Sequence, residues 1–232
     1  MKALLATATA IASFALVLGA NPASAVVLYD GLVSPAQTPS QQNWLYQASA
    51  IAPIPTATAT SSGTVLDTTG TSSNSAGYFN QTPVILDRSN GYTVSFKLRV
   101  SSESHGTNNN RAGFSVIVMS NQGAGETQPY GVELGFWLNN IWAQSSTFTK
   151  SETATYNTQS LAHTYHLKVS GNQYQLFVDD ATTPTLQGPL RQYSYTPPAG
   201  YPNPYKTPNL IFWGDNTTSA NSKVTLIRVE AN

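Results

Sequence analysis

The sequence contains no cysteine and few charged side chains. Cysteine is missing from all 232 residues, which excludes thiol catalysis, disulfide bonds and cysteine-ligated zinc. Charged residues make up 9% of the chain, and the formal net charge is +0. A chain this close to neutrality lacks the basic surface that binding to nucleic acid or to an anionic membrane requires. We therefore expect neither of these partners.

Long apolar runs are also scarce, and the one clear example lies at the amino terminus. An alanine-rich stretch follows Lys2 and leads to Ala23-Ser24-Ala25, the small-residue pattern of a signal-peptide cleavage site. We interpret residues 1–25 as a secretory signal peptide and residues 26–232 as a single domain. A transmembrane helix is the alternative, which the alanine and threonine content of the run disfavours. We therefore predict a secreted, extracellular protein, and the lack of cysteine favours a bacterial one.

Helical periodicity is absent, whereas two-residue alternation recurs along the chain. Residues 92–100 alternate apolar and polar side chains strictly, as expected for a strand with one buried face. About a dozen such short segments are separated by turn residues, which predicts an all-β, two-sheet antiparallel β-sandwich, a jelly roll. We expect residues 51–63 to form a surface loop, residues 44–46 to anchor the core, and residues 188–208 to form a proline-stiffened loop pinned by its tyrosines.

The clearest hairpin pattern in the sequence is the stretch YGVELGFWLNNIWAQSS, residues 130–146. Asn139-Asn140 suits a tight two-residue turn with positive φ, because asparagine tolerates that conformation well. Such a turn places Trp137 opposite Trp142 and Glu133 opposite Ser146, with Leu138 facing Ile141, Phe136 facing Ala143 and Gly135 facing Gln144. One face of the hairpin is then apolar. The other carries both tryptophans, Glu133 and Gln144.

Four stretches of the sequence resemble a known family. They are GYTVSFKLRVSSESHGTNNNRAGFSVIVMSN, YGVELGFWLNNIWAQ, TYHLKVSGNQYQLFVDD and TPNLIFWGDNTTSANSKVTLIRVE. Together they are similar to secreted bacterial concanavalin A-like (laminin G-like) jelly-roll domains of the "choice-of-anchor" type. The likeness runs from about Tyr29 to Val229 and is most specific in the GVELGFW hairpin and in FWGD. The chain ends at Asn232 without an apolar tail, so we expect a released protein rather than an anchored one.

The resemblance implies a concave sheet that often holds a glycan, which directs attention to the polar face of the hairpin. Trp137 and Trp142 are candidates to stack on sugar rings, and Glu133, Gln144, Arg111 and Ser115 are candidates to donate or accept directional hydrogen bonds. The leading hypothesis is non-catalytic binding of carbohydrate or another extracellular polymer. The sequence leaves the ligand and the oligomeric state open.

Two other functions remain open at this point. A polysaccharide lyase or glycoside hydrolase would use Arg111, Glu133, Gln144 and His105, with Tyr130 near the same strands. The glucanases of this fold carry E-x-D-x-x-E and its lyases carry Q-[IV]-H, and GVELGFW and IWAQ match neither pattern. Hydrolysis also needs two carboxyl groups about 5–9 Å apart, and Glu133 is the only acid in the hairpin. The third possibility is a structural scaffold in which the tryptophans are covered by loops.

Calcium is the cofactor to consider, because it takes oxygen ligands and stiffens loops in sandwiches of this class. The oxygen-rich candidates are Asp179, Asp180 and Asp215, and none lies in an EF-hand pattern. Acidic residues at strand ends more often cap turns, so calcium stays an open possibility. His163 and His166 flank Tyr165 and are expected to point to opposite faces of a strand, which does not suit a shared metal.

Overall fold

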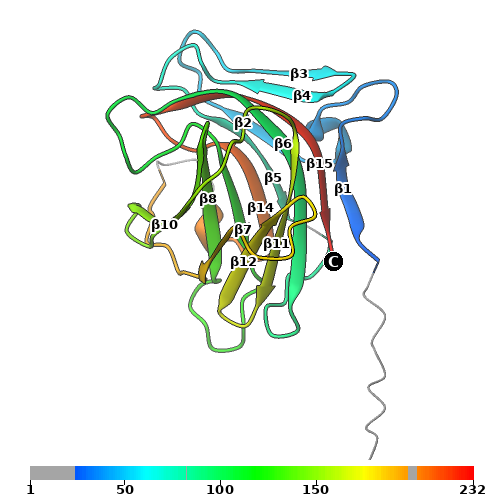
Figure 1. The fold of residues 1–232 in the computed structure, drawn as a ribbon, viewed down its shortest axis with the longest axis vertical. Coiled ribbons are helices and arrows are strands. Elements are labelled where there is room, and N and C mark those ends of the chain that lie inside the picture. Colours follow the sequence, from blue (N-terminus) through cyan, green and yellow to red (C-terminus); the bar gives the residue numbers. More distant parts are fainter. Residues whose placement is uncertain (1–23, 82, 198–202) are drawn as a thin grey trace, which may run out of the picture.

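Two antiparallel β-sheets pack face to face, as the alternation predicts (Figure 1). The computed structural model describes residues 24–81, 83–197 and 203–232. Its short helical segments are two 3₁₀ turns, η1 (Pro39–Gln42) and η2 (Pro204–Lys206). Most of the predicted signal peptide lies outside the described residues. Within those residues, no helix is long and apolar enough to cross a membrane.

The first sheet has eight strands, in the order β13-β12-β11-β6-β15-β4-β3, with β1 paired to β15. Its strands are β1 (Val26–Asp30), β3 (Thr56–Thr60), β4 (Gly63–Asp67), β6 (Tyr92–Ser104), β11 (His163–Ser170), β12 (Gln173–Val178), β13 (Leu186–Pro189) and β15 (Asn221–Ala231).

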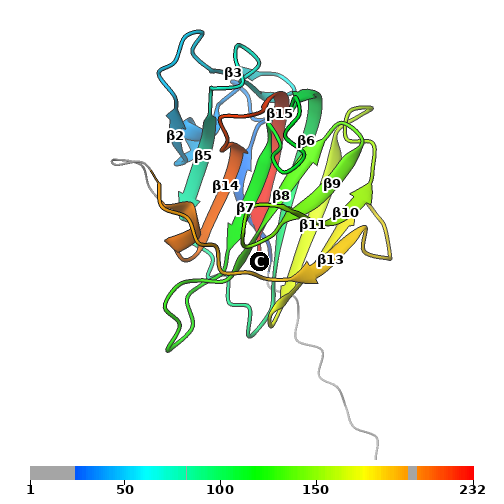
Figure 2. The ribbon, with the colours of Figure 1, turned by 90° about the vertical axis from the view of Figure 1, so that its left-hand side faces the viewer.

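The second sheet has seven strands, in the order β10-β9-β8-β7-β14-β5-β2. Its strands are β2 (Leu45–Ala48), β5 (Ala76–Gln81), β7 (Ser115–Met119), β8 (Gly131–Trp137), β9 (Asn140–Gln144), β10 (Lys150–Thr155) and β14 (Leu210–Asp215). The outer face of this sheet is turned to the viewer in Figure 2.

The main core lies between the two sheets, because each strand turns alternate apolar side chains inward. Phe96 of β6, Phe136 of β8 and Tyr165 of β11 form its aromatic centre, with ring centroids 5.2–6.1 Å apart. All three side chains are buried. Trp213 of β14 packs against Tyr29 at one side of this core, with ring centroids 5.6 Å apart. Burial of these large apolar surfaces is the main stabilising contribution to the fold.

A second, smaller apolar cluster lies on the outer face of the seven-stranded sheet. Its buried members are Ile117, Met119, Tyr193, Tyr205, Leu210 and Phe212. The two tyrosines belong to residues 190–197 and 203–209, the described parts of the connection between β13 and β14, which we call the strap. Figure 2 shows the strap crossing in front of the sheet from β13 toward η2. The prediction that tyrosines pin this proline-rich segment is therefore confirmed for Tyr193 and Tyr205, whereas Tyr195 is 36% exposed and residues 198–202 lie outside the described residues.

One local prediction is wrong, and another holds for Trp44 but not for its two neighbours. Residues 51–63 include the edge strand β3, which pairs with β4 from Thr56 to Thr60 and is not a simple loop. Of the expected anchors at residues 44–46, Trp44 is buried, whereas Leu45 is 75% exposed and Tyr46 is 37% exposed. Leu45 lies on the outer face of an edge strand, opposite Phe79, so the sandwich core never reaches it.

Truncating the aromatic centre should test the packing of the core. We expect Phe96→Ala to lower the free energy of unfolding by about 3–5 kcal/mol, because the buried ring is replaced by a cavity. Urea-induced unfolding followed by tryptophan fluorescence measures this change. Leu161→Ala, at a position that is 58% exposed, is the control, and it should cost less than about 0.5 kcal/mol. Equal losses in the two variants would contradict the assigned core.

Candidate functional site

The hairpin of β8 and β9 forms, but its register differs from the prediction by two residues. Trp137 pairs with Asn140, Gly135 with Trp142 and Phe136 with Ile141, so the turn is Leu138-Asn139. Among the non-glycine residues that the structure describes, positive φ occurs at Asn43, Phe148, Asp179 and Asn209. The hairpin turn is therefore not the primed type expected for two asparagines. A shift of two residues leaves each side chain on its predicted face.

The two tryptophans lie on the same face, as predicted, but they do not form an open platform. Their ring centroids are 5.8 Å apart in an edge-to-face arrangement. Trp142 is buried. Trp137 is half-buried, and its ring is stacked against His105 at 3.9 Å and lies under the Lys150 ammonium at 4.1 Å. Neither indole presents a clear ring face for a ligand to stack on.

Glu133 is the centre of a buried hydrogen-bond network on this face. Its carboxylate accepts hydrogen bonds from Tyr205 Oη at 2.7 Å and from Asn216 Nδ2 at 3.1 Å. Arg111 Nη2 lies 3.5 Å from Glu133 Oε1. Glu133 is 0% exposed, so these partners replace the water that an ionised carboxylate requires.

The charges of this network shift the pKa values of its members. Burial is the largest single influence on the pKa of Arg111 and lowers it, but Glu133, Tyr205 and Asp215 together raise it by more, so the net shift is upward. Burial and the same Glu133 charge raise the pKa of Tyr205 well above its ordinary value. At neutral pH Arg111 is therefore a cation and Tyr205 a neutral hydroxyl. Such a hydroxyl can donate to Glu133.

The strap covers the predicted site. Tyr193 Oη accepts a hydrogen bond from Glu133 N at 2.9 Å and donates one to Gln144 O at 3.1 Å. Gln144 and Ser115 are buried beneath this cover with Glu133 and Trp142. Gln144 Oε1 accepts from Arg111 Nη1 at 3.4 Å. Sequence reasoning thus placed Arg111, Glu133 and Gln144 together correctly, but it did not foresee that the strap encloses the last two.

An open pocket of about 700 Å³ lies beside the strap, on the β14, β5 and β2 side of the same sheet. Its apolar lining consists mainly of Phe79, Phe148, Tyr195, Phe212, Pro197 and Pro204. Arg111, Asp215, Asn216, Thr217 and Thr218 supply polar groups from one end, and Gln47, Ser49, Ser73 and Ser75 supply them from the other side. A hollow of this size, with aromatic walls and a few polar groups, is typical of small-molecule sites.

Cross-strand pairing and a glycine explain the flat floor of this pocket. Phe212 pairs with Ile117 on one side and with Phe79 on the other, and Phe79 pairs with Leu45, so an apolar row crosses four strands. Gly77 is essential to this arrangement, because a Cβ there would collide with the Phe212 ring. The ring therefore lies across Gly77, against the sheet.

Two buried carboxyl groups stand near the polar end of the pocket. Burial raises the pKa of Asp215 well above its ordinary value, against the effect of hydrogen bonds from Thr68 Oγ1 at 2.8 Å and Thr217 N at 3.1 Å. Burial also raises the pKa of Glu103, which shares a hydrogen bond with His105 Nδ1 at 3.0 Å. His105 thus contacts Glu103 and Trp137 and does not reach over the face near Glu133.

The calcium candidates are separated and have other partners. Asp179 Oδ2 lies 2.7 Å from His163 Nδ1, Asp180 is exposed beside it, and Asp215 is buried on the other sheet. Among the described residues, no group of three or more His, Cys, Asp or Glu is arranged to hold a metal ion. His163 and His166 point to opposite faces of β11, as predicted, since His163 is buried in the sandwich and His166 bonds Ser95.

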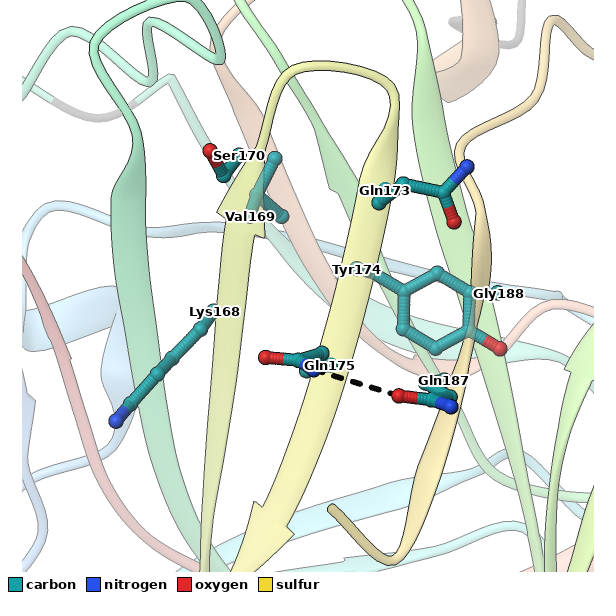
Figure 3. Close-up of a pocket in the computed structure, with 8 residues that line it drawn as sticks. All are labelled: Lys168, Val169, Ser170, Gln173, Tyr174, Gln175, Gln187 and Gly188. Atoms are coloured by element: carbon teal, nitrogen blue, oxygen red, sulfur yellow. Dashed lines mark hydrogen bonds between the residues drawn. The ribbon is translucent and has the colours of Figure 1, made fainter. Parts of the chain in front are cut away.

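A second hollow, of about 640 Å³, lies at the end of the first sheet (Figure 3). Lys168, Gln175 and Gln187 pair across β11, β12 and β13, and Gln175 Nε2 donates to Gln187 Oε1 at 3.3 Å. Figure 3 shows Lys168 pointing away from the two glutamines. Tyr174 is the one aromatic residue among the described lining, and it is buried. This polar hollow offers no exposed ring face.

The fold is similar to those of three solved structures. The carbohydrate esterase vb_24B_21 from Shiga toxin-encoding bacteriophage phi24B has a TM-score of 0.54 at 13% identity, covering 90% of this chain and 100% of that chain. A variant of the carbohydrate recognition domain of Emp46p has a TM-score of 0.51 at 10% identity, covering 88% and 94%. The Ca²⁺/Man-bound exoplasmic/lumenal domain of VIP36 has a TM-score of 0.50 at 12% identity, covering 90% and 88%.

At these identities the likeness shows the fold alone, a lectin-like sandwich consistent with a concanavalin A-like domain. No protein-family model matches the sequence, and no curated protein matches it either. The choice-of-anchor resemblance therefore stays a prediction.

Sequence reasoning named Arg111 and Asp215, which line the open pocket, but it missed the aromatic residues that form its walls. Phe79 and Phe212 each occur in a predicted strand, and nothing in the local pattern shows that the two strands pair. Tyr195 lies in the strap, whose path over the sheet is equally invisible. The sequence did carry one signal, because Phe79 and Phe212 alternate with core residues in their strands and therefore point to the outer face of the sheet. A large apolar side chain on an outer face is usually covered by another segment or by a ligand.

Removing the Tyr205 hydroxyl tests the network around Glu133. We expect Tyr205→Phe to lower the free energy of unfolding by about 1–3 kcal/mol, because a buried carboxylate loses a donor that no water replaces. Urea unfolding measures the loss. Tyr195→Phe is the matched control, at a strap tyrosine that is 36% exposed, and should change stability by less than about 0.5 kcal/mol. A Tyr205→Phe variant as stable as the control would refute the network.

Asp215 should make stability depend on pH. Its pKa is raised in the folded state, so the folded chain keeps a proton that the unfolded chain loses above about pH 4. The stabilisation that protonated Asp215 gives the folded state is therefore complete below about pH 4, and it is lost as the pH rises toward the pKa of Asp215 in the folded state. Asp215→Asn should therefore flatten the decline in stability, by up to about 1.4 kcal/mol per pH unit. Urea midpoints between about pH 4 and 8 test this. Parallel curves for wild type and variant would contradict it.

Proposed function

We propose that this protein is a secreted, non-catalytic β-sandwich that binds carbohydrate in the open pocket beside the strap. The observation that carries the proposal is the composition of that pocket: aromatic rings and prolines line a hollow of about 700 Å³, together with Arg111, Asp215 and several neutral polar side chains. Sugar rings combine an apolar face with a rim of hydroxyl groups. Aromatic side chains complement the face, and amide and hydroxyl side chains complement the rim.

The solved neighbours give the proposal separate support. A mannose-bound domain, a carbohydrate recognition domain and a carbohydrate esterase share the sandwich. Fold alone does not fix function, so the weight rests on the pocket. The proposal keeps the predicted sheet and the predicted class of ligand, and it moves the site from the covered Trp137/Trp142 pair to Phe79, Phe148, Tyr195 and Phe212.

The two alternative functions, an enzyme acting on polysaccharides and a structural scaffold, fit the geometry of this sheet less well. A lyase or hydrolase built on Arg111, Glu133, Gln144 and His105 would need substrate contact with Glu133, which is 0% exposed beneath Tyr205. A pure scaffold would leave no groove on this sheet, yet a groove remains beside the strap. Secretion is supported by the cleavage pattern at Ala23-Ser24-Ala25 and by the lack of cysteine.

Truncating a half-buried aromatic wall of the pocket tests the proposal. We expect Phe79→Ala to weaken binding to whichever polysaccharide the wild type retains by at least about tenfold, equivalent to roughly 1.4 kcal/mol. Pull-down on a polysaccharide panel, followed by calorimetry on the polymer that is retained, measures this. Incubation of the same polymers with the protein should release no reducing ends and no unsaturated products.

Gln187→Ala, in the hollow of Figure 3, is the matched control, because it alters a side chain of the other hollow on the opposite sheet. It should leave affinity unchanged. Loss of binding in Gln187→Ala with full binding in Phe79→Ala would move the site to the first sheet. Binding to no polymer, or turnover of any of them, would overturn the proposal.

A further inference from the structure

We propose that the open pocket selects uncharged glycans, and that Glu133 determines this selectivity by cancelling the charge of Arg111 from beneath the strap. The inference rests on the proposed carbohydrate binding and deepens it. It gives the buried carboxylate a function that requires no contact with the ligand. Glu133 is therefore a specificity-determining residue and not a catalytic one.

The charges around the pocket carry the argument. Among the described residues that line it, the charged side chains are Arg111 and Asp215. An unpaired arginine beside an aromatic wall would suit a uronate or a sulfated sugar, since guanidinium groups bind carboxylate and sulfate readily. Here Arg111 Nη2 lies 3.5 Å from Glu133 Oε1, in surroundings with little water to screen the pair. The field that Arg111 projects into the pocket is therefore largely cancelled.

The hydrogen-bonding capacity of Arg111 is also engaged. Its Nη2 donates to Asn216 Oδ1 at 3.0 Å and lies 3.4 Å from Asn216 O, while Nη1 donates to Gln144 Oε1 at 3.4 Å. The guanidinium carbon lies 5.6 Å from the centroid of the Phe148 ring. An anion held by both Nη atoms would compete with these contacts. Arg111 is thus built into the wall.

Asp215 supplies no attraction for an anion in either protonation state. Its carboxyl group is buried and accepts from Thr68 Oγ1 and Thr217 N. When protonated it leaves the pocket without net charge, and when ionised it repels anions. The remaining polar lining is neutral: Gln47, Ser49, Ser73, Ser75, Asn216 and Thr218. Hydroxyl and amide groups of this kind match sugar hydroxyls and give no preference for charge.

Matched polymers test the inference on the wild-type protein. Dextran and dextran sulfate share a backbone and differ in charge, as do chitin and chitosan, and polygalacturonate adds a uronate. Mannan and galactan extend the uncharged set. We expect retention of at least one uncharged polymer, with an affinity that changes less than about twofold between low and high salt, because no ion pair is screened. Dextran sulfate and polygalacturonate should bind at least about tenfold more weakly than that polymer.

The variant Glu133→Gln tests the assigned role directly. The amide is isosteric and keeps an acceptor for Tyr205, while Arg111 loses its counter-ion. We expect a gain of at least about tenfold in affinity for polygalacturonate, abolished by high salt, with binding to the uncharged polymer kept. The double variant Glu133→Gln/Arg111→Gln should lose this gain, because it restores neutrality. Circular dichroism shows whether each variant is folded.

The outcomes separate this inference from the proposed function. Salt-sensitive binding of the wild type to dextran sulfate or polygalacturonate, above every uncharged polymer, would overturn the inference and leave carbohydrate binding intact. A folded Glu133→Gln variant without any gain for polygalacturonate would overturn the role of Glu133. Binding of the wild type to no polymer at all would overturn both. If Glu133→Gln fails to fold, the comparison of charged and uncharged polymers on the wild-type protein still tests whether the pocket selects uncharged glycans.

Discussion

The arrangement of the candidate site depends on one buried carboxylate. Glu133 lies on the outer face of the second sheet, and Tyr205 of the strap, Asn216 after β14 and Arg111 before β7 all contact it. An ionised carboxylate without water is tolerated only when such partners surround it, so Glu133 fixes three separate chain segments relative to the sheet. The strap in turn forms one wall of the pocket. The neutrality of that pocket follows from the same contact, because the charge that holds Arg111 also cancels it.

The open pocket exists because the apolar row on this face is only partly covered. Tyr193 and Tyr205 bury Ile117 and Met119, and the row then continues through Phe212 and Phe79 to the exposed Leu45. An exposed apolar surface framed by polar groups is a common property of ligand sites. Here the strap sets where cover ends and the accessible pocket begins. One end of this apolar row therefore stabilises the fold by packing against the strap, and in our proposal the other end binds the glycan.

The features of the fold and of the candidate site that could be predicted from the sequence are those set by neighbouring residues, whereas contacts between residues far apart in the sequence could not be predicted. The alternation along residues 92–100 shows which face of a strand is buried, and this is a local property of the sequence. The β-sandwich was predicted correctly from it. The polar face of the hairpin was assigned correctly for the same reason, although Trp137 pairs with Asn140 and not with Trp142. Cover of this face by loops was an open alternative, but the segment that provides it was not predictable, because Tyr193 and Tyr205 reach Glu133 across about 60 and 72 residues of sequence and no periodicity encodes that contact. The pairing of Phe79 with Phe212 was hidden for the same reason.

The central claim is that a glycan occupies the pocket beside the strap while Tyr193 and Tyr205 stay in place. A crystal structure of the protein with an oligosaccharide cut from the polymer it retains tests this most directly. Our account predicts sugar density against Phe79 and Tyr195, hydrogen-bonded near Asn216 and Thr218, with Tyr205 still bonded to Glu133. Density in the hollow formed by Gln175 and Gln187, or a sugar on Trp142 with the strap displaced, would contradict it.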